Sequence, residues 1–273
     1  MKVYRARHGG FCFGVKRAIR LALEAVRKVK PIYSLGPLIH NRLAVEELKK
    51  KGIITVNSIR AIKNKRVIIR SHGINPEVLE QLRKKDFEIV DATCPRVRRA
   101  QRFVERLINE GYYVVIIGEE DHPEIKGLLG YAQGRGVIFN EQLRIRHRRI
   151  GVVPQTTLDV DHFNYAISRI LPNATEVKIY NTICHETVLR IKEAKKLARR
   201  CDVMIVVGGK NSANTTRLYE VCKRYKPSYH IESAEEISGE WFKDAESVGI
   251  TAGASTPKIQ VDQVVKRLKL LSV

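Results

Sequence analysis

Three of the five cysteines in this sequence have the same local surroundings. Cys12, Cys94 and Cys184 lie 82 and 90 residues apart, and each stands between a short run that predicts a strand and a pattern that predicts a helix. A cysteine at the start of a helix meets the positive end of the helix dipole, which favours the thiolate. Because the thiolate is the form that binds metals, the repeated context predicts a metal centre with three thiolate ligands.

Two kinds of metal centre fit three widely spaced cysteines. Zinc held by three cysteines and a histidine is possible, although structural zinc sites usually take ligands from closely spaced pairs, and this sequence has no CxxC motif. An iron–sulfur cluster tolerates wide spacing, and three thiolates on a four-iron cluster leave one iron open, as a catalytic site requires. Cys201 and Cys222 have other contexts, and we expect them to be thiols of the core.

Each of the three cysteines is followed by two polar loops at similar distances. The first loop lies 28 residues on and holds His40, His122 or Ser212. The second lies 60, 62 or 71 residues on, in segments 70–73, 154–157 and 251–255. The sequence therefore predicts three similar α/β units. In parallel α/β sheets ligands bind beyond the carboxyl ends of the strands, which is where the cysteines and both loops would lie.

The side chains of these loops are suited to an anion. Histidines can donate hydrogen bonds or carry positive charge, whereas hydroxyls and amides donate without charge. Such a set predicts a phosphate or diphosphate beside the metal, bound by His40, His72, His122, Thr156, Ser212, Asn214 and Ser255. Glu124 is the one acid with an evident task, which is proton delivery. The alternative interpretation of Glu124 is a first-turn helix acid favoured by the dipole.

The elements that must position these residues alternate along the chain. Strands are expected over 67–69, 114–117 and 203–207, and helices over 15–29, 77–84, 98–109, 188–199 and 216–223. This alternation predicts an α/β fold with mostly parallel sheets. The predicted domains are 13–95, 96–183, and 184–273 together with 1–12.

The composition and net charge limit the expected cellular location and the classes of binding partner. The 273 residues carry 50 Lys and Arg against 29 Asp and Glu, a net charge of +21 that favours anionic partners. No apolar run is long enough to cross a membrane and the N-terminus lacks the pattern of a signal peptide, so a cytoplasmic protein is expected. A basic nucleic-acid-binding protein with structural cysteines is the alternative, with segment 146–149 as its best patch. Only 7% of residues are aromatic, however, and they do not interleave with basic residues.

A set of motifs runs from Cys12 to Ser255. The motifs are GFCFGV (10–15), GPLIHN (36–41), SHG (71–73), DATCP (91–95), HPE (122–124), QTT (155–157), NTIC (181–184), KNSAN (210–214) and GITAGAS (249–255). This set resembles the 4-hydroxy-3-methylbut-2-enyl diphosphate reductases. They are specific in combination and cover nearly the whole chain.

The resemblance implies a trefoil of three α/β domains around one 4Fe-4S cluster held by Cys12, Cys94 and Cys184. It implies the reductive removal of a hydroxyl from an allylic diphosphate, which gives isopentenyl and dimethylallyl diphosphates, with electrons from an acidic donor such as a ferredoxin or flavodoxin. The carried-over diphosphate ligands are His40, His72, His122, Ser212, Asn214 and Ser255. Glu124 would supply protons, and Thr156 would orient the substrate hydroxyl.

The sequence departs from this family's pattern at a few positions. Ala213 stands where the family commonly has a second serine, and Phe13 and Lys16 replace the commoner Ala and Asp. Segment 185–187 differs as well, and the stretch after Cys94 is unusually basic. None of these changes removes a cysteine or Glu124.

Overall fold

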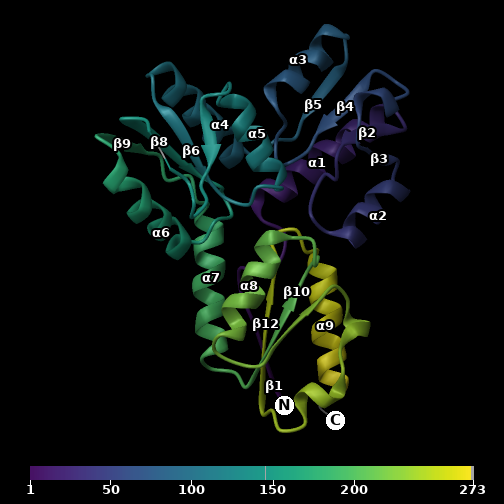
Figure 1. Cartoon of the computed structure of the whole chain (residues 1–273). Helices are drawn as coiled ribbons and strands as arrows, with labels where there is room; N and C mark the ends of the chain where they lie inside the picture. Colours follow the sequence, from purple (N-terminus) through teal and green to yellow (C-terminus); the bar gives the residue numbers. More distant parts are fainter. Residues whose placement is uncertain (145, 272–273) are drawn as a thin grey trace. The chain divides into compact units, whose positions relative to one another are not determined.

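The computed structural model describes residues 1–144 and 146–271, and these contain three separate four-stranded sheets. Every strand pairing among them is parallel. The expectation of an α/β fold built from three similar parallel-sheet domains is confirmed (Figure 1).

The strands of each sheet come from one stretch of sequence, with one exception at the N-terminus. Sheet B contains β2 (Ile32–Leu35), β3 (Ile53–Val56), β4 (Arg66–Ile69) and β5 (Glu88–Asp91). Sheet C contains β6 (Tyr113–Ile117), β7 (Gly136–Ile138), β8 (Arg149–Pro154) and β9 (Glu176–Ile179). Sheet A contains β10 (Val203–Val207), β11 (Ser228–Ile231) and β12 (Ser247–Ala252), and its fourth strand is β1 (Lys2–Arg5).

All three sheets have the same strand order. The first strand of each lies between the second and third, and the fourth lies outside the third: β3-β2-β4-β5, β7-β6-β8-β9 and β11-β10-β12-β1. Since the pairings are parallel, the carboxyl ends of the strands in one sheet meet at one edge. The first and third strands lead into the two polar loops, and the fourth leads to the cysteine.

Nine α-helices are found in the described residues. They are α1 (Phe13–Lys28), α2 (Arg42–Lys50), α3 (Pro76–Lys84), α4 (Pro95–Asn109), α5 (Pro123–Tyr131), α6 (Val160–Ile170), α7 (His185–Ala198), α8 (Ala213–Lys223) and α9 (Lys258–Leu270). The five expected helices are present, but each begins one to three residues earlier than expected. Prolines at the first position of α3 and α4 fix a helical φ there, yet the first turn carries little of the apolar periodicity on which the prediction depended.

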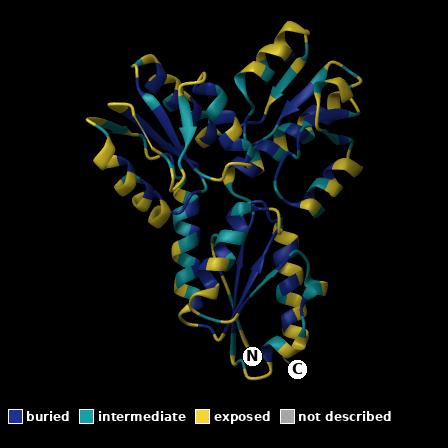
Figure 2. Ribbon diagram, in the orientation of Figure 1, coloured by how far each residue is buried: buried dark blue, intermediate teal, exposed yellow. Residues whose placement is uncertain are grey.

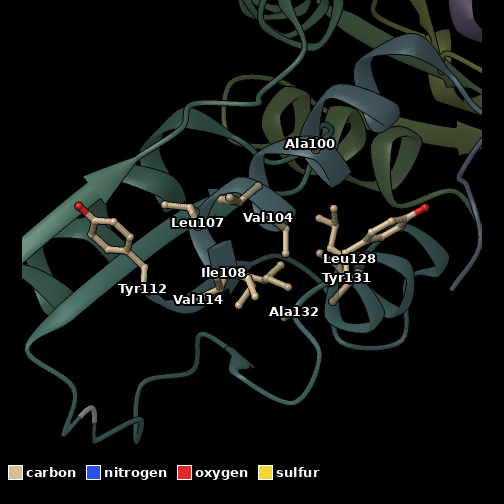
Figure 3. Close-up of a cluster of buried hydrophobic side chains, with 12 residues drawn as sticks. Ala100, Val104, Leu107, Ile108, Tyr112, Val114, Leu128, Tyr131 and Ala132 are labelled. Carbon is tan, nitrogen blue, oxygen red and sulfur yellow. The ribbon is translucent and has the colours of Figure 1, made fainter. Parts of the chain in front are cut away.

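The helices form because each presents one apolar face. On α4 the buried residues are Val97, Ala100, Gln101, Val104, Leu107 and Ile108, which repeat every three or four positions. This face packs with side chains of β6 and α5 in a shared core (Figure 3). In Figure 2 the central strands are dark blue and the outward faces of the helices are yellow, as burial against the sheets requires.

The contacts of the chain divide it into two compact units. The first comprises Met1–Lys16, Ile39–Glu47 and the chain from His185 onward, and it holds sheet A. The second comprises Arg17–Leu38 and Leu48–Cys184, and it holds sheets B and C. The domain boundaries 13–95 and 96–183, and the third domain of 184–273 with 1–12, stay a prediction. No helix in the described part of the chain is both long and apolar enough to cross a membrane.

Candidate active site

The three candidate cysteines are built into their sheets in the same way. Cys12, Cys94 and Cys184 each stand directly before the first residue of a helix, α1, α4 or α7. The backbone N–H of each also donates to a carbonyl in the second polar loop of its own sheet. These bonds run from Cys12 to Ala254 (3.0 Å), from Cys94 to Ser71 (2.9 Å) and from Cys184 to Thr156 (2.8 Å). The repeat that the spacing predicted is therefore also a repeat of backbone structure.

The side chains of the five cysteines fall into two classes. Cys12, Cys94 and Cys184 are partly exposed, whereas Cys201 and Cys222 are fully buried. Burial raises the pKa of the Cys222 thiol to about 12 and also raises the pKa of Cys201. The expectation that these two are core thiols is confirmed. The three accessible thiols at helix starts are the set whose chemistry fits metal or cluster ligation.

Glu124 and Thr156 form a buried pair in the second unit. Glu124 lies in the first turn of α5, and Thr156 follows β8. The Thr156 backbone N–H donates to Oε1 of Glu124 and its hydroxyl donates to Oε2, both at 2.7 Å. Burial raises the pKa of Glu124 to about 7, although the two hydrogen bonds from Thr156 act in the opposite direction. A carboxyl that is half protonated near neutral pH can deliver a proton.

Two histidines of the second unit lie beside each other. His72 follows β4, and His122 is the N-cap of α5. Their rings meet edge to face, with centroids 5.6 Å apart. Nδ1 of His122 accepts a hydrogen bond from the Glu124 backbone N–H at 3.1 Å, so the proton of the neutral ring is on Nε2. His122 therefore presents an N–H donor while its other nitrogen holds the start of α5.

Sheet A brings three of the predicted anion ligands together in the first unit. Ser212 is the N-cap of α8, and its hydroxyl makes no capping bond to the helix. Asn214 lies in the first turn of α8, and its buried Nδ2 group has no hydrogen-bond partner among the described residues. Ser255, in the loop after β12, is also buried. An unsatisfied buried amide next to a helix N-terminus is suited to an anionic ligand.

His40 belongs to the first unit although β2 belongs to the second. Its neighbour Asn41 fixes the loop, because Nδ2 of Asn41 donates to Oε1 of Gln260 at 3.0 Å and Oδ1 accepts from the Ala44 N–H at 2.9 Å. The His40 carbonyl oxygen lies against Gly209, where a Cβ atom would be only 3.1 Å away. His40 therefore joins Cys12, Ser212, Asn214 and Ser255 in the first unit. The second unit holds Cys94, Cys184, His72, His122, Glu124 and Thr156.

Sequence reasoning missed two residues that hold these loops in place. Arg190 is buried in α7, and its guanidinium donates to the carbonyls of Ala252 (2.8 Å) and Gly10 (2.9 Å). Oε1 of Gln155 accepts the Glu119 N–H at 3.0 Å and Nε2 of Gln155 donates to Oγ1 of Thr157 at 2.8 Å. A signal for Arg190 was present, because it shares a stripe of α7 with the buried Ala194 and Ala198 at spacings of four.

Comparison with known proteins places the chain among reductases. Relatives named 4-hydroxy-3-methylbut-2-enyl diphosphate reductase occur in Syntrophotalea carbinolica (46% identical over 279 residues, 100% of both chains) and Aquifex aeolicus (46% over 274 residues, 97% of this chain and 94% of the relative). A third occurs in Geobacter sulfurreducens (44% over 274 residues, 98% and 97%).

Solved structures agree with these relatives. A structure of (E)-4-hydroxy-3-methyl-but-2-enyl diphosphate reductase, described as the terminal enzyme of the non-mevalonate pathway, is 44% identical, has a TM-score of 0.73 and covers 99% of this chain and 100% of its own. The E-1-hydroxy-2-methyl-but-2-enyl-4-diphosphate reductase of Plasmodium falciparum is 26% identical, has a TM-score of 0.92 and covers 100% of this chain and 88% of its own. The profile of the LytB protein family matches residues 3–269, and the chain belongs to this family.

Proposed function

We propose that this chain is an oxidoreductase that converts 4-hydroxy-3-methylbut-2-enyl diphosphate to isopentenyl and dimethylallyl diphosphates, with loss of the hydroxyl as water. The family match over residues 3–269 carries this proposal. The nucleic-acid-binding alternative gains no support from the relatives found. Arg149, in the basic segment considered for it, is engaged within the fold by Glu176 at 2.8 Å.

The cofactor of the proposed reaction is one 4Fe-4S cluster. Cys12, Cys94 and Cys184 would hold it, since they are the accessible thiols and share one backbone environment. When bound, such a cluster would pass on, one at a time, the two electrons that cleavage of the C–O bond requires.

The histidines and the neutral donors would hold the diphosphate. His40, Ser212, Asn214 and Ser255 would contribute from the first unit, and His72 and His122 from the second. Nε2–H of His122 and the unsatisfied Nδ2 group of Asn214 are the donors best defined by their surroundings. Binding energy from the diphosphate end would position the hydroxymethyl end of the substrate.

Glu124 and Thr156 would move the proton to the departing hydroxyl. In the structure Thr156 donates to Oε2 of Glu124. When Oε2 is protonated, the same 2.7 Å contact reverses, and the Thr156 hydroxyl hydrogen can point to a substrate oxygen. The relay then passes one proton from the carboxyl, through Thr156, to the leaving hydroxyl. The allyl carbon takes a second proton, so that two electrons and two protons give the product and water.

An acidic electron carrier such as a ferredoxin or flavodoxin would supply the electrons. The net charge of +21 favours such a partner. Phe13, directly after Cys12, is 67% exposed, and the exposed Lys16 lies one turn further along α1. An apolar side chain with a neighbouring cation is suited to docking an acidic protein beside this thiol. We place the protein in the cytoplasm, where thiolates stay reduced.

The proposal is tested by anaerobic purification, iron and sulfide counts, and turnover of the allylic diphosphate with a chemical reductant. Iron and sulfide near four each per chain, and both five-carbon products by mass spectrometry, are expected. A colourless protein with one zinc per chain would overturn the cofactor, and a loaded cluster with no turnover would overturn the reaction.

A further inference from the structure

One cavity of the second unit adjoins the residues proposed for catalysis but is not lined by them. It has a volume of about 600 Å³, within the range of small-molecule sites. It lies where the ends of β2 and β4 meet helices α3 and α5, which contact each other (Figure 1). None of the cysteines, histidines or acid–base residues assigned above lines it.

The charged side chains that line this cavity are all basic. They are Arg60, Arg70, Lys85 and Lys126, and no acidic residue is among the lining. Lys126 bonds Asp121 at 3.0 Å on the exposed surface, whereas the other three form no ion pair within the described chain. Three cations without a carboxylate partner around one cavity favour an anionic occupant.

Arg70 is the most constrained of these cations. It is only partly exposed, and its guanidinium lies over Gly36, where a Cβ atom would stand 2.6 Å from one Nη atom. Burial lowers the pKa of Arg70, and the guanidinium has no hydrogen-bond partner in the part of the chain that is described. A partly desolvated cation without an acid is costly, and a bound anion would offset that cost.

Apolar side chains form part of the remaining wall of the cavity. Leu35, Pro37, Ile59, Ile74, Val78 and Pro123 contribute them. Amide and hydroxyl groups of Asn57, Ser58 and Gln81 supply neutral partners. We propose that this cavity binds an amphipathic organic diphosphate, with its head on Arg60, Arg70 and Lys85 and its hydrocarbon chain on the apolar walls.

The occupant would touch the backbone that carries the candidate active site. Arg70 precedes Ser71 and His72, and Pro123 directly precedes Glu124. Binding here would therefore change the affinity for the substrate of the proposed reaction. The binding itself does not depend on that reaction, so the two can fail separately.

The test is calorimetric titration of the holoprotein with geranyl diphosphate, in the wild type and in an Arg60→Glu/Lys85→Glu variant. Binding in this cavity, which is separate from binding at the candidate active site, should weaken about tenfold or more in the variant. The matched control is Lys63→Glu/Arg83→Glu, which makes the same charge change at exposed residues that do not line the cavity. Retained binding of dimethylallyl diphosphate by the double variant would show that its fold is intact.

Three results would overturn the proposal. They are no binding of geranyl diphosphate, equal binding by the two double variants, and equal binding of inorganic diphosphate and geranyl diphosphate. Equal binding of these two diphosphates would show that the hydrocarbon chain does not contribute to recognition. A shift in the KM of the substrate with geranyl diphosphate, absent from the Arg60→Glu/Lys85→Glu variant, would support the link to the active-site loops.

Discussion

The starts of α5 and α8 occupy the same place in sheets C and A, yet they carry different chemistry. Each helix follows the first strand of its sheet, with its N-cap at His122 or Ser212. The second helical residue is Glu124 in one and Asn214 in the other. Glu124 is hydrogen-bonded twice by Thr156, whereas Nδ2 of Asn214 has no partner among the described residues. The same backbone arrangement thus places a proton donor at the start of α5 and a neutral anion ligand at the start of α8.

The largest effect is expected when the acid is removed. Glu124→Gln keeps the shape and the acceptor oxygen but cannot deliver a proton, so kcat should fall by roughly 10²–10⁴-fold. The absorbance of the cluster and the KM should change little. Steady-state kinetics with Glu120→Gln, an exposed acid of the same loop, as control would check this. Near-normal turnover by Glu124→Gln would exclude the proton role.

The converse substitution should damage binding in sheet A. Asn214→Asp replaces a buried donor with a carboxylate that repels the diphosphate, so the KM should rise by roughly 10–100-fold with a smaller change in kcat. The control is Asn211→Asp, which makes the same charge change at an exposed residue. If kcat fell and the KM stayed constant, Asn214 would belong with the proton donor instead.

The raised pKa of Glu124 predicts the direction of the pH dependence. The protonated carboxyl is the active form, and its fraction falls as the pH rises through about 7. Where proton delivery limits turnover, kcat should decrease by about tenfold per pH unit above 7. Activity measured from pH 5.5 to 9 should lose this dependence in Glu124→Gln. A rise of kcat through the same range would mean that the ionised form is required.

Two substitutions at Thr156 distinguish the role of its hydroxyl from that of its backbone N–H. Thr156→Val keeps the N–H bond to Oε1 but removes the hydroxyl, and kcat should fall by about tenfold. Thr156→Ser should restore most of the rate because it returns the hydroxyl. Equal rates for the two variants would place the proton path elsewhere.

The smallest effect concerns Ala213, between Ser212 and Asn214. Ala213→Ser adds one neutral hydroxyl at the partly exposed start of α8, so the KM should fall by no more than about fivefold. A rise in the KM would indicate that the diphosphate does not lie over this turn.

The features of this molecule that could be predicted are those that depend on residue spacing and apolar periodicity within short segments of the sequence. The repeat of Cys12, Cys94 and Cys184 and the apolar strands required only spacing and periodicity, and the parallel sheets follow from them. The pairing of Glu124 with Thr156 could be anticipated because both residues follow the ends of β6 and β8, which are neighbouring strands of one sheet.

Other contacts could not be predicted because they join distant segments through single hydrogen bonds. Arg190 bonds Gly10 across 180 residues, and Asn41 bonds Gln260 across 219. The latter bond places the His40 loop in the first unit rather than with the strand that precedes it. The basic cavity could not be predicted from the sequence either. Its four cations come from separate elements, and only the fold brings them together without an acidic residue in the lining.

Proton delivery by Glu124 requires that its carboxyl stay protonated to near-neutral pH, and infrared difference spectroscopy measures this directly. A carboxylic-acid C=O band that titrates near pH 7 and is absent from Glu124→Gln is expected. Loss of every Glu124 carboxylic-acid signal by pH 5 would contradict it.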